Sequence, residues 1–403
     1  MPLRCSKNLS VLIAGGGIGG LCAAVALVKK GIAVTVCERA SEFSEVGAGI
    51  QLSPNATRIF HAWGFEAALK KIAFQPEAVE ARSWLDGNLI GSAPLGELIN
   101  ARLGAPYLHV HRADLVALLV DFLQKSQLAQ LRLASPITQC CSRGEPWVVF
   151  ENGEHIYGDV LVGADGIHST IRAALFGKKA LRFTGSIAWR GIIPTKEITG
   201  ADIRPVTSLW MGPGAHFVHY YVRRGELLNF IGVIEENIRG DESWAARGSK
   251  IELLRHFGNW HPIIQKIVGA APEDGCYRWP LYDREPLDEW CRGATILVGD
   301  ACHPALPSLA QGACMAIEDA AVLGECLEGL SGHDTIAALK RFEALRKPRT
   351  NAIQKKSRSN SQVYHMRPPL SWARNLIMRS GVGLWEQVEQ IYAYDAIASA
   401  QDY

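Results

Sequence analysis

Apolar and polar residues follow a strand and helix pattern near the start of the chain. Residues 10–14 and 33–37 are short apolar runs, and residues 21–30, between them, are rich in Ala, Leu and Val. Short apolar runs bounded by turn residues are typical of buried strands. The middle segment ends in Lys30 and Gly31, as a helix often does. The pattern therefore predicts a strand, a helix and a second strand.

Two further apolar runs, residues 159–163 and 294–299, have the same character. The first leads into Asp165-Gly166 and a helix, and the second leads, after a proline-containing loop, into a long helix over residues 313–330. Strands that alternate with helices indicate a parallel sheet. We therefore predict an α/β fold with a Rossmann-like domain assembled from distant parts of the chain.

Residues 181–290 have a different rhythm. Short runs with alternating polarity occupy residues 186–193, 206–211, 216–222 and 227–234, separated by Gly, Pro and charged residues. This spacing is typical of an antiparallel sheet, to which we expect residues 78–107 to add strands. After residue 340 the pattern predicts helices that are interrupted near residues 367–370.

Composition adds limits to this picture. The chain has 403 residues, 48% hydrophobic and 20% charged, and a net charge of +2, which is typical of an ordinary globular protein of two or more domains. Charge is concentrated in residues 340–379, which hold eleven Lys or Arg and a single acid, Glu343. Such a stretch suits a membrane surface, a nucleic acid or an acidic face of its own protein. We favour the last of these and expect no nucleic-acid partner.

Ten cysteines are scattered without metal-ligand spacing, and no Cys-x-x-Cys occurs. We therefore expect free thiols, no metal site and a cytoplasmic location. Residues 10–28 carry no charge, which raises the question of a membrane span, but glycines interrupt the stretch. A strand, turn and helix fit it better, and we expect no membrane span.

A glycine-rich turn separates the first predicted strand from the first helix. Gly15, Gly17 and Gly20 have the spacing Gly-x-Gly-x-x-Gly, and Glu38 ends the second strand. In this motif the glycines allow a tight turn, a close backbone approach to a pyrophosphate and close packing of helix on strand. The helix N-terminus attracts the anion, and the acidic residue accepts hydrogen bonds from ribose hydroxyls. The motif predicts a dinucleotide site without separating FAD from NAD.

A second element far along the chain narrows the choice. Gly299 and Asp300 end a predicted strand, at the edge where open α/β sheets bind ligands, so Asp300 is placed to bond a ribityl or ribose hydroxyl. Gln311-Gly312 opens the long helix, whose N-terminus stabilises negative charge such as that of a reduced flavin. A cofactor held by both ends of the chain indicates FAD.

The segment around Gln51 stays open to two interpretations. Glycines at positions 47 and 49 suit a close approach to a ligand, and Ser53-Pro54 resembles the start of a helix. An ordinary loop before a helix would look the same. We take Gln51 as a candidate cofactor contact.

In their order along the chain these motifs resemble the single-component, FAD-dependent aromatic hydroxylases of the p-hydroxybenzoate hydroxylase fold. The landmarks are the early glycine motif, Asp165-Gly166 and Gly299-Asp300. The stretches 109–115, 188–191 and 299–320 are most similar to the branch with salicylate hydroxylase, 3-hydroxybenzoate 6-hydroxylase and 6-hydroxynicotinate 3-monooxygenase. The resemblance spans roughly residues 8–350 and does not specify a substrate.

The resemblance implies an enzyme with bound FAD, NADH or NADPH as a transient co-substrate, and O2. It would hydroxylate a small phenolic or hydroxylated heteroaromatic acid through a flavin C4a-hydroperoxide. A homodimer is also expected. The implied cofactor-binding residues are Gly15, Gly17, Gly20, Glu38, Arg39, Gln51, Arg112, Asp165, Gly299, Asp300, Gln311 and Gly312. Pro307 matches the proline beside the flavin edge where oxygen reacts, and we count it as catalytic.

The resemblance also implies a division of the chain. The FAD-binding domain would comprise residues 1–77, 108–180 and 291–345. The substrate domain would comprise residues 78–107 and 181–290. A C-terminal helical region would follow over residues 346–403.

The catalytic candidates lie on the predicted strand 216–222. Its period of two places His216, Val218 and Tyr220 on one face. A histidine so spaced from a tyrosine is similar to the polar pair that binds or deprotonates the ring hydroxyl in relatives. Histidine has an ordinary pKa of about 6.5, which suits a base for a phenol.

Alternatives remain at this stage. His216 and Tyr220 could satisfy each other structurally. The scaffold could carry an epoxidase or oxidase instead, or bind flavin without catalysis. Arg190 and Arg223 are weaker candidates for anchoring a substrate carboxylate.

Overall fold

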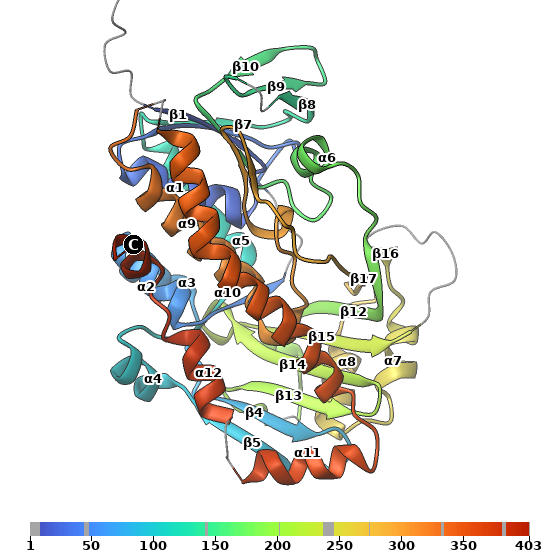
Figure 1. The fold of residues 1–403 in the computed structure, drawn as a ribbon. Coiled ribbons are helices and arrows are strands. Elements are labelled where there is room, and N and C mark those ends of the chain that lie inside the picture. The colour runs from blue at the N-terminus through green and yellow to red at the C-terminus, as the bar shows by residue number, and fades with distance from the viewer. Residues whose placement is uncertain are drawn as a thin grey trace, which may run out of the picture.

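The computed structural model describes residues 9–43, 48–141, 144–200, 202–236, 246–273, 275–331, 334–380 and 384–402. Two large sheets organise the molecule, the six-stranded sheet in the upper half of Figure 1 and the eight-stranded sheet in the lower half. This is the mixed α/β architecture that the sequence predicts.

The six-stranded sheet is assembled from distant parts of the chain. In spatial order its strands are β18 (Cys291–Arg292), β19 (Thr295–Leu297), β11 (Val160–Gly163), β1 (Ser10–Ala14), β2 (Ala33–Cys37) and β7 (Ala129–Arg132). All neighbours are parallel except β18 and β19. The central strands are almost entirely apolar because they are buried in one core that also contains residues of α1, α9 and β9.

The helices of this half form one continuous core with the sheet. They are α1 (Ile18–Lys29), α2 (Pro54–Ala62), α3 (Glu66–Ile72), α5 (Arg112–Gln124), α6 (Thr170–Phe176) and α9 (Gly312–Leu327). Helix α1 begins at Ile18, earlier than the expected residue 21, so that Gly19 and Gly20 lie within its first turn. Helices α1 and α9 are buried along most of their length and pack against each other.

The eight-stranded sheet contains all four runs expected in residues 181–290. In spatial order its strands are β16 (Ala246–Arg247), β17 (Tyr277–Asp283), β12 (Arg182–Pro194), β15 (Leu227–Glu235), β14 (Ala215–Val222), β13 (Thr207–Gly212), β4 (Ala78–Ser83) and β5 (Leu89–Pro94). Every neighbouring pair is antiparallel except β13 and β4. No hairpin joins these two strands, so no turn dictates their relative direction.

Helices α7 (Lys250–Phe257) and α8 (Pro262–Ala270) cover one face of this sheet. Phe217 and Phe230 stack on each other there, and Phe217 makes an edge contact with Phe257. The segment after β5 is not strand throughout, since residues 96–103 form α4 (Gly96–Leu103). Because α7 and α8 cover the first face, only the opposite face of the eight-stranded sheet can line a cavity.

Smaller elements complete the described chain. Two short sheets contain β3 (Gly49–Leu52) with β6 (Leu108–His111), and β8 (Ile137–Cys141) with β9 (Trp147–Phe150) and β10 (His155–Tyr157). Four 3-10 turns are η1 (Thr195–Glu197), η2 (Arg223–Gly225), η3 (Gly299–Ala301) and η4 (Pro307–Leu309). The C-terminal helices are α10 (Thr335–Tyr364), α11 (Leu370–Arg379), α12 (Leu384–Tyr392) and α13 (Ala396–Gln401).

The basic C-terminal stretch packs largely on the protein itself, as expected. Helix α10 lies along α9 and then reaches the eight-stranded sheet (Figure 1). Its Arg346 and Arg349 pair with acids of α9, and its Arg358 pairs with Asp283 of β17. The expected break falls between the end of α10 and the start of α11.

Residues 10–28 form a strand, a turn and a helix, as predicted. Within the described ranges, no helix is both long enough and apolar enough to cross a membrane. The nine cysteines in the same ranges are all free thiols, and no group of three or more metal-binding side chains is found there.

Candidate active site

A cavity of about 930 Å³ lies where the two large sheets approach each other. One end is lined by Gly17 at the start of α1, and Asp300 and Pro307 lie further along it. The strand β14 contributes His216 and Tyr220 to the wall. The volume is within the range of roughly 300–1,000 Å³ that is common for ligand sites.

The early glycine motif has the geometry that its sequence predicts. Gly15 has φ +106°, and a Cβ there would lie 2.4 Å from the carbonyl oxygen of Ala164. A Cβ on Gly20 would lie 1.9 Å from the carbonyl oxygen of Gly15, so helix and turn touch directly. Gly17 has nothing within 4 Å of that position and faces the cavity. Gly15 and Gly20 allow close packing of the turn and the helix, and Gly17 leaves room for a ligand.

Glu38 ends β2 as expected, but its carboxylate already holds the turn together. Oε2 accepts a hydrogen bond from the backbone of Gly16 at 2.6 Å, and Oε1 accepts one from Ala40 at 2.8 Å. A carboxylate has further acceptor sites, so a ribose contact is still available. Arg39 is exposed beside it.

Asp300 is the most open carboxylate of the cavity. It lies deep in the fold at η3, and its side chain is exposed because it lines the cavity. None of the hydrogen bonds among the described residues involves it. Burial raises the pKa of the Asp300 carboxyl, while His303, Arg112 and Arg190 act in the opposite direction.

The loop after Asp300 brings several expected residues to one place. Pro307 lines the cavity within η4, and Gly312 lines it at the first residue of α9. Gly299 has φ +56°, which ends the strand two residues earlier than predicted. Gln311 is buried, but its side chain bonds Ser53 and Asn55, so only its backbone belongs to the helix N-terminus.

Arg112 and Gln51 also reach the cavity. Gln51 Oε1 accepts a hydrogen bond from the Tyr107 hydroxyl at 2.6 Å. Asp165 has a different setting, since its carboxylate bonds the Ser169 hydroxyl and caps the first turn of α6. Its role toward a cofactor stays a prediction.

Strand β14 divides its side chains as the period of two predicts. His216, Val218 and Tyr220 line the cavity, whereas Phe217 packs in the core beneath α7 and α8. Gly49 leaves room for the tyrosine, because a Cβ there would lie 2.8 Å from the Tyr220 hydroxyl.

The two candidates have opposite electrostatic tendencies. Burial lowers the pKa of His216 well below its ordinary value, and the neighbouring His365 lowers it further. Burial raises the pKa of Tyr220, although Arg190 and Gln51 oppose the rise. At neutral pH His216 is therefore a neutral acceptor, and Tyr220 is a protonated donor.

The two weaker candidates have different settings, and one further residue, His365, was not anticipated. Arg190 lines the cavity, and its Nε is buried without a hydrogen-bond partner. Arg223, the other weak candidate, pairs with Asp114 on a partly exposed surface instead. His365 contacts His216 from the loop after α10.

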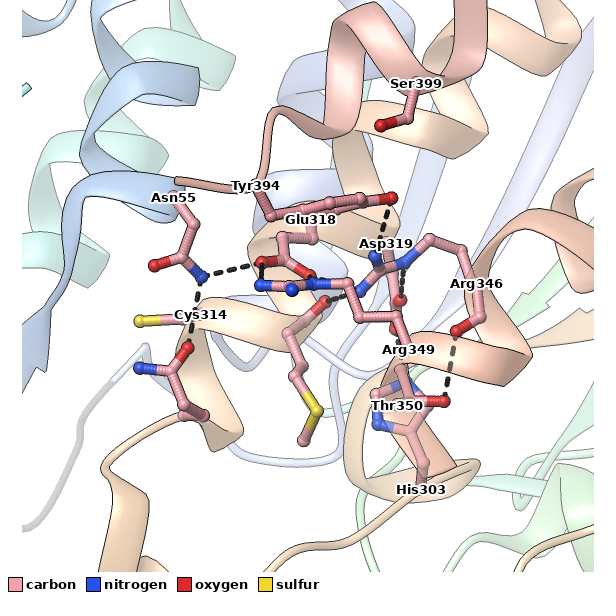
Figure 2. A network of polar contacts seen from close by, with 12 residues as sticks. Asn55, His303, Cys314, Glu318, Asp319, Arg346, Arg349, Thr350, Tyr394 and Ser399 are labelled. Atoms are coloured by element: carbon pink, nitrogen blue, oxygen red, sulfur yellow. Dashed lines mark hydrogen bonds and ion pairs between the residues drawn. The ribbon is translucent and has the colours of Figure 1, made fainter. Parts of the chain in front are cut away.

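A closed network of charges supports the cavity from behind α9 (Figure 2). Arg346 donates to Asp319 at 2.8 Å and to Glu318 at 2.7 Å, and all three side chains are fully buried. Arg349 adds two bonds to Glu318, and His303 lies 2.6 Å from Asp319. The sequence analysis did not predict this network. The one signal for it in the sequence is that two adjacent acids, Glu318 and Asp319, lie in an otherwise apolar helix.

This network is connected to both cofactor-side loops. Asn55 of α2 donates to Glu318 at 2.6 Å, and the backbone of Gly299 donates to Asp319 at 3.0 Å. Burial alone would raise the pKa of Asp319, but His303 and Arg346 outweigh it and lower it to about 2. The network therefore stays ionised and holds the loop that presents Asp300.

The cavity fits FAD by its donor set. Gly17 leaves a cradle that a Cβ would fill, at a helix N-terminus that suits a pyrophosphate. Asp300 offers unpaired acceptors for ribityl hydroxyls, and Arg190 Nε is a buried donor in need of a partner. Gly312 places the N-terminus of α9 where a flavin anion would be stabilised.

Comparison with known proteins identifies the class. The chain belongs to the FAD binding domain family, whose model matches residues 8–357. It is an FAD-dependent aromatic monooxygenase, an enzyme of the group that the motifs resemble.

Particular relatives cover nearly the whole chain. The 6-hydroxynicotinate 3-monooxygenase of Pseudomonas fluorescens is 36% identical over 372 residues, which is 91% of this chain and 94% of that protein. The 3-hydroxybenzoate 6-hydroxylase of Polaromonas naphthalenivorans (strain CJ2) is 34% identical over 392 residues, 96% of each. The crystal structure of Klebsiella pneumoniae HpxO with FAD and uric acid has a TM-score of 0.85 at 27% identity, covering 99% of each chain.

Proposed function

We propose that this enzyme hydroxylates the ring of a phenolic or hydroxylated heteroaromatic acid, with NADH or NADPH and O2 as co-substrates. The observation that carries the proposal is that one strand face presents His216 and Tyr220 to the cavity that also contains Asp300 and Pro307. The relatives named for hydroxynicotinate and hydroxybenzoate support the substrate class.

Bound FAD would supply the activation of O2 and deliver one oxygen atom as an electrophile. The chain's own residues would prepare the ring. His216, neutral because burial lowers its pKa, accepts the proton of the ring hydroxyl and so makes the ring electron-rich. Tyr220, kept protonated by burial, donates a hydrogen bond to the ring oxygen and holds it beside His216.

The acidic group of the substrate also has a partner in this scheme. Arg190 is a buried cation whose Nε has no hydrogen-bond partner in the structure. Its guanidinium lies over the Trp279 ring at 5.4 Å, which fixes its plane. An anionic group in the cavity would complete its bonding.

The first test is a panel of hydroxybenzoates, hydroxypyridines and hydroxyquinolines, scored for NAD(P)H oxidation and for oxygenated product together. We expect at least one phenolic acid to stimulate oxidation and to yield product. Oxidation that forms only hydrogen peroxide with every member, alongside epoxidation of an alkene, would favour the alternative reaction.

A second test uses matched variants on the two faces of β14. His216→Gln should lower the rate of ring hydroxylation by about 100-fold, the size expected for loss of a general base. FAD content and flavin reduction should not change. The control is His219→Gln on the opposite face, where His219 only accepts a bond from Trp210. Equal hydroxylation rates in both variants would contradict the role of His216.

Other features stay predictions: the homodimer, the cytoplasmic location, the domain boundaries, and the role of Asp165 in binding FAD and NADH or NADPH.

A further inference from the structure

A string of hydrogen bonds leads from the cavity wall to the protein surface. His216 Nδ1 lies 2.7 Å from His365 Nε2, and His365 Nδ1 lies 3.2 Å from Glu235 Oε1. Arg367 donates to the other oxygen of Glu235 at 3.0 Å. The side chains of His216 and His365 are buried, whereas that of Glu235 is 42% exposed. The string therefore has one end in the cavity and one end in solvent.

The string is held by the turn between β13 and β14. The backbone of Gly214 donates to the His365 carbonyl at 3.0 Å and accepts from the Glu235 amide at 2.9 Å. Gly214 has φ +70°, and a Cβ there would lie 2.7 Å from Arg367 Nη2. Glycine is favoured at this turn because its φ lies in the left-handed region, and the ion pair lies directly beside it. Gly214 thus holds the end of β15 and the loop after α10 in contact.

The bonding pattern determines where the protons lie. The Glu235 carboxylate can only accept, so His365 Nδ1 carries a proton. Neutral His365 then accepts at Nε2, and His216 must carry its proton at Nδ1. This leaves His216 Nε2 as a lone pair. Nε2 has no hydrogen-bond partner among the described residues, and the ring lines the cavity. The string thus sets His216 in the tautomer that a base requires.

We propose that His216, His365 and Glu235 form a proton relay that carries the proton of the ring hydroxyl from the cavity to the protein surface. His216 Nε2 takes the proton from the hydroxyl, and its Nδ1 proton passes to His365 Nε2. The Nδ1 proton of His365 passes to Glu235, which releases it to water. One O–H bond of the substrate breaks, one proton reaches solvent, and both rings end in the other neutral tautomer. Reverse transfer restores them when the product takes up a proton.

The charges around the string are few. The Tyr364 ring makes an edge contact with His216, and its hydroxyl donates to the Ser308 carbonyl. Arg367 faces Glu235, and Arg374 donates to the carbonyls of Val363 and Tyr364. Burial lowers the pKa of His365, and Glu235 raises it in part. No second acid among the described residues is bonded to either ring, so Glu235 is the acceptor at the end of the string.

The proposal rests on the proposed function, and the test separates the two. The probe is 3-hydroxy-4-nitrobenzoate, whose phenolate is coloured. It is mixed with anaerobic holoenzyme in weak buffer with an indicator dye, so that phenolate formation and proton release are recorded together. In the natural protein both signals should rise in one phase.

The decisive variant is His365→Gln, since the amide can accept from His216 and donate to Glu235 but cannot pass a proton. It should slow phenolate formation and proton release by about 10-fold or more, while FAD content and reduction by NAD(P)H are unchanged. His365→Ala should be slowed equally, and added imidazole should restore its rate. Glu235→Gln, at the exposed end, should also slow proton release.

The possible results distinguish failure of the relay from failure of the proposed function. Unslowed proton release in His365→Gln and Glu235→Gln, in a protein that hydroxylates a phenol, would overturn the relay and leave the proposed function standing. Failure of the natural protein to ionise the probe or to hydroxylate any phenol would instead overturn the proposed function. Slowing without rescue by imidazole would show that His365 is structural, which also overturns the relay.

Discussion

Two aspartates lie on either side of His303 along the chain and have opposite surroundings. Asp319 accepts from His303, Arg346 and the backbone of Gly299, and these partners outweigh its burial and lower its pKa to about 2. Asp300 has no hydrogen bond among the described residues, and burial raises its pKa. The protein satisfies the first carboxylate completely and leaves the second to face the cavity. A carboxylate that faces a cavity without a protein partner is available to a ligand, whereas Asp319 is not.

The same contrast separates the two regions around these residues. Behind α9, every charge of the network in Figure 2 has its counter-charge within the fold. In the cavity, Asp300, Arg190 Nε and His216 Nε2 have no hydrogen-bond partner in the described chain. We expect substitutions in the first region to act on stability, and substitutions in the second to act on ligands and chemistry.

The largest effect is expected for Arg346→Met. It leaves Glu318 and Asp319 with fewer counter-charges in a fully buried setting, and breaking a buried pair costs about 3–5 kcal/mol. Urea unfolding of the holoenzyme measures the loss. Lys347→Met is the matched control, because its pair with Glu343 is partly exposed and should cost no more than about 1 kcal/mol. Equal losses in both variants would contradict a closed network.

Asp300→Ala should show the opposite behaviour. Loss of a charged hydrogen-bond partner is worth about 1.5–3 kcal/mol, so FAD should dissociate about 10- to 100-fold more readily. The apoprotein should unfold at unchanged urea concentration, because no protein group loses a hydrogen bond. Flavin fluorescence on dilution measures the first quantity. Retained FAD affinity, or a destabilised apoprotein, would remove the distinction between Asp300 and Asp319.

Acid should weaken the fold through buried histidines. Burial lowers the pKa of His109 and of His219 to about 3, so the unfolded chain binds protons that the folded chain does not. Stability is therefore complete above pH 6.5 and falls as the pH decreases toward 3, by about 1 kcal/mol per pH unit for each histidine. His219→Gln should flatten this slope in urea unfolding at a series of pH values. His155→Gln, at an exposed position, should not.

The smallest effect is expected for Arg223→Ala. Its pair with Asp114 is 2.7 Å long, but the side chains are 42% and 21% exposed. Such pairs contribute about 0–1 kcal/mol. Substrate-stimulated NAD(P)H oxidation should be unchanged, since Arg223 does not line the cavity. A rise in the substrate KM would show that Arg223 belongs to the substrate site.

The sequence predicted the parts of this molecule that depend on neighbouring residues. The glycine spacing at Gly15 and Gly20 encodes a local turn, and the period of two encodes which side of β14 bears His216. What escaped prediction depends on residues far apart in the chain. The residues near His365 in the sequence do not indicate that it contacts His216. Arg346 bonds Asp319 only because two helices pack together. Asp165 follows a strand, as the pattern predicts, but nothing in the local sequence shows that its side chain caps a helix, and its role toward a cofactor stays a prediction.

Helix α10 also has a consequence for the order in which the protein is made. Its Arg346 and Arg349 neutralise acids of α9, and Arg341 bonds the carbonyl of Ala400 in the last helix. A nascent chain that has emerged only through α9 carries two unneutralised acids in a helix meant for the interior. We therefore expect the cofactor half to mature only after α10 has been synthesised, so that flavin binds after that point.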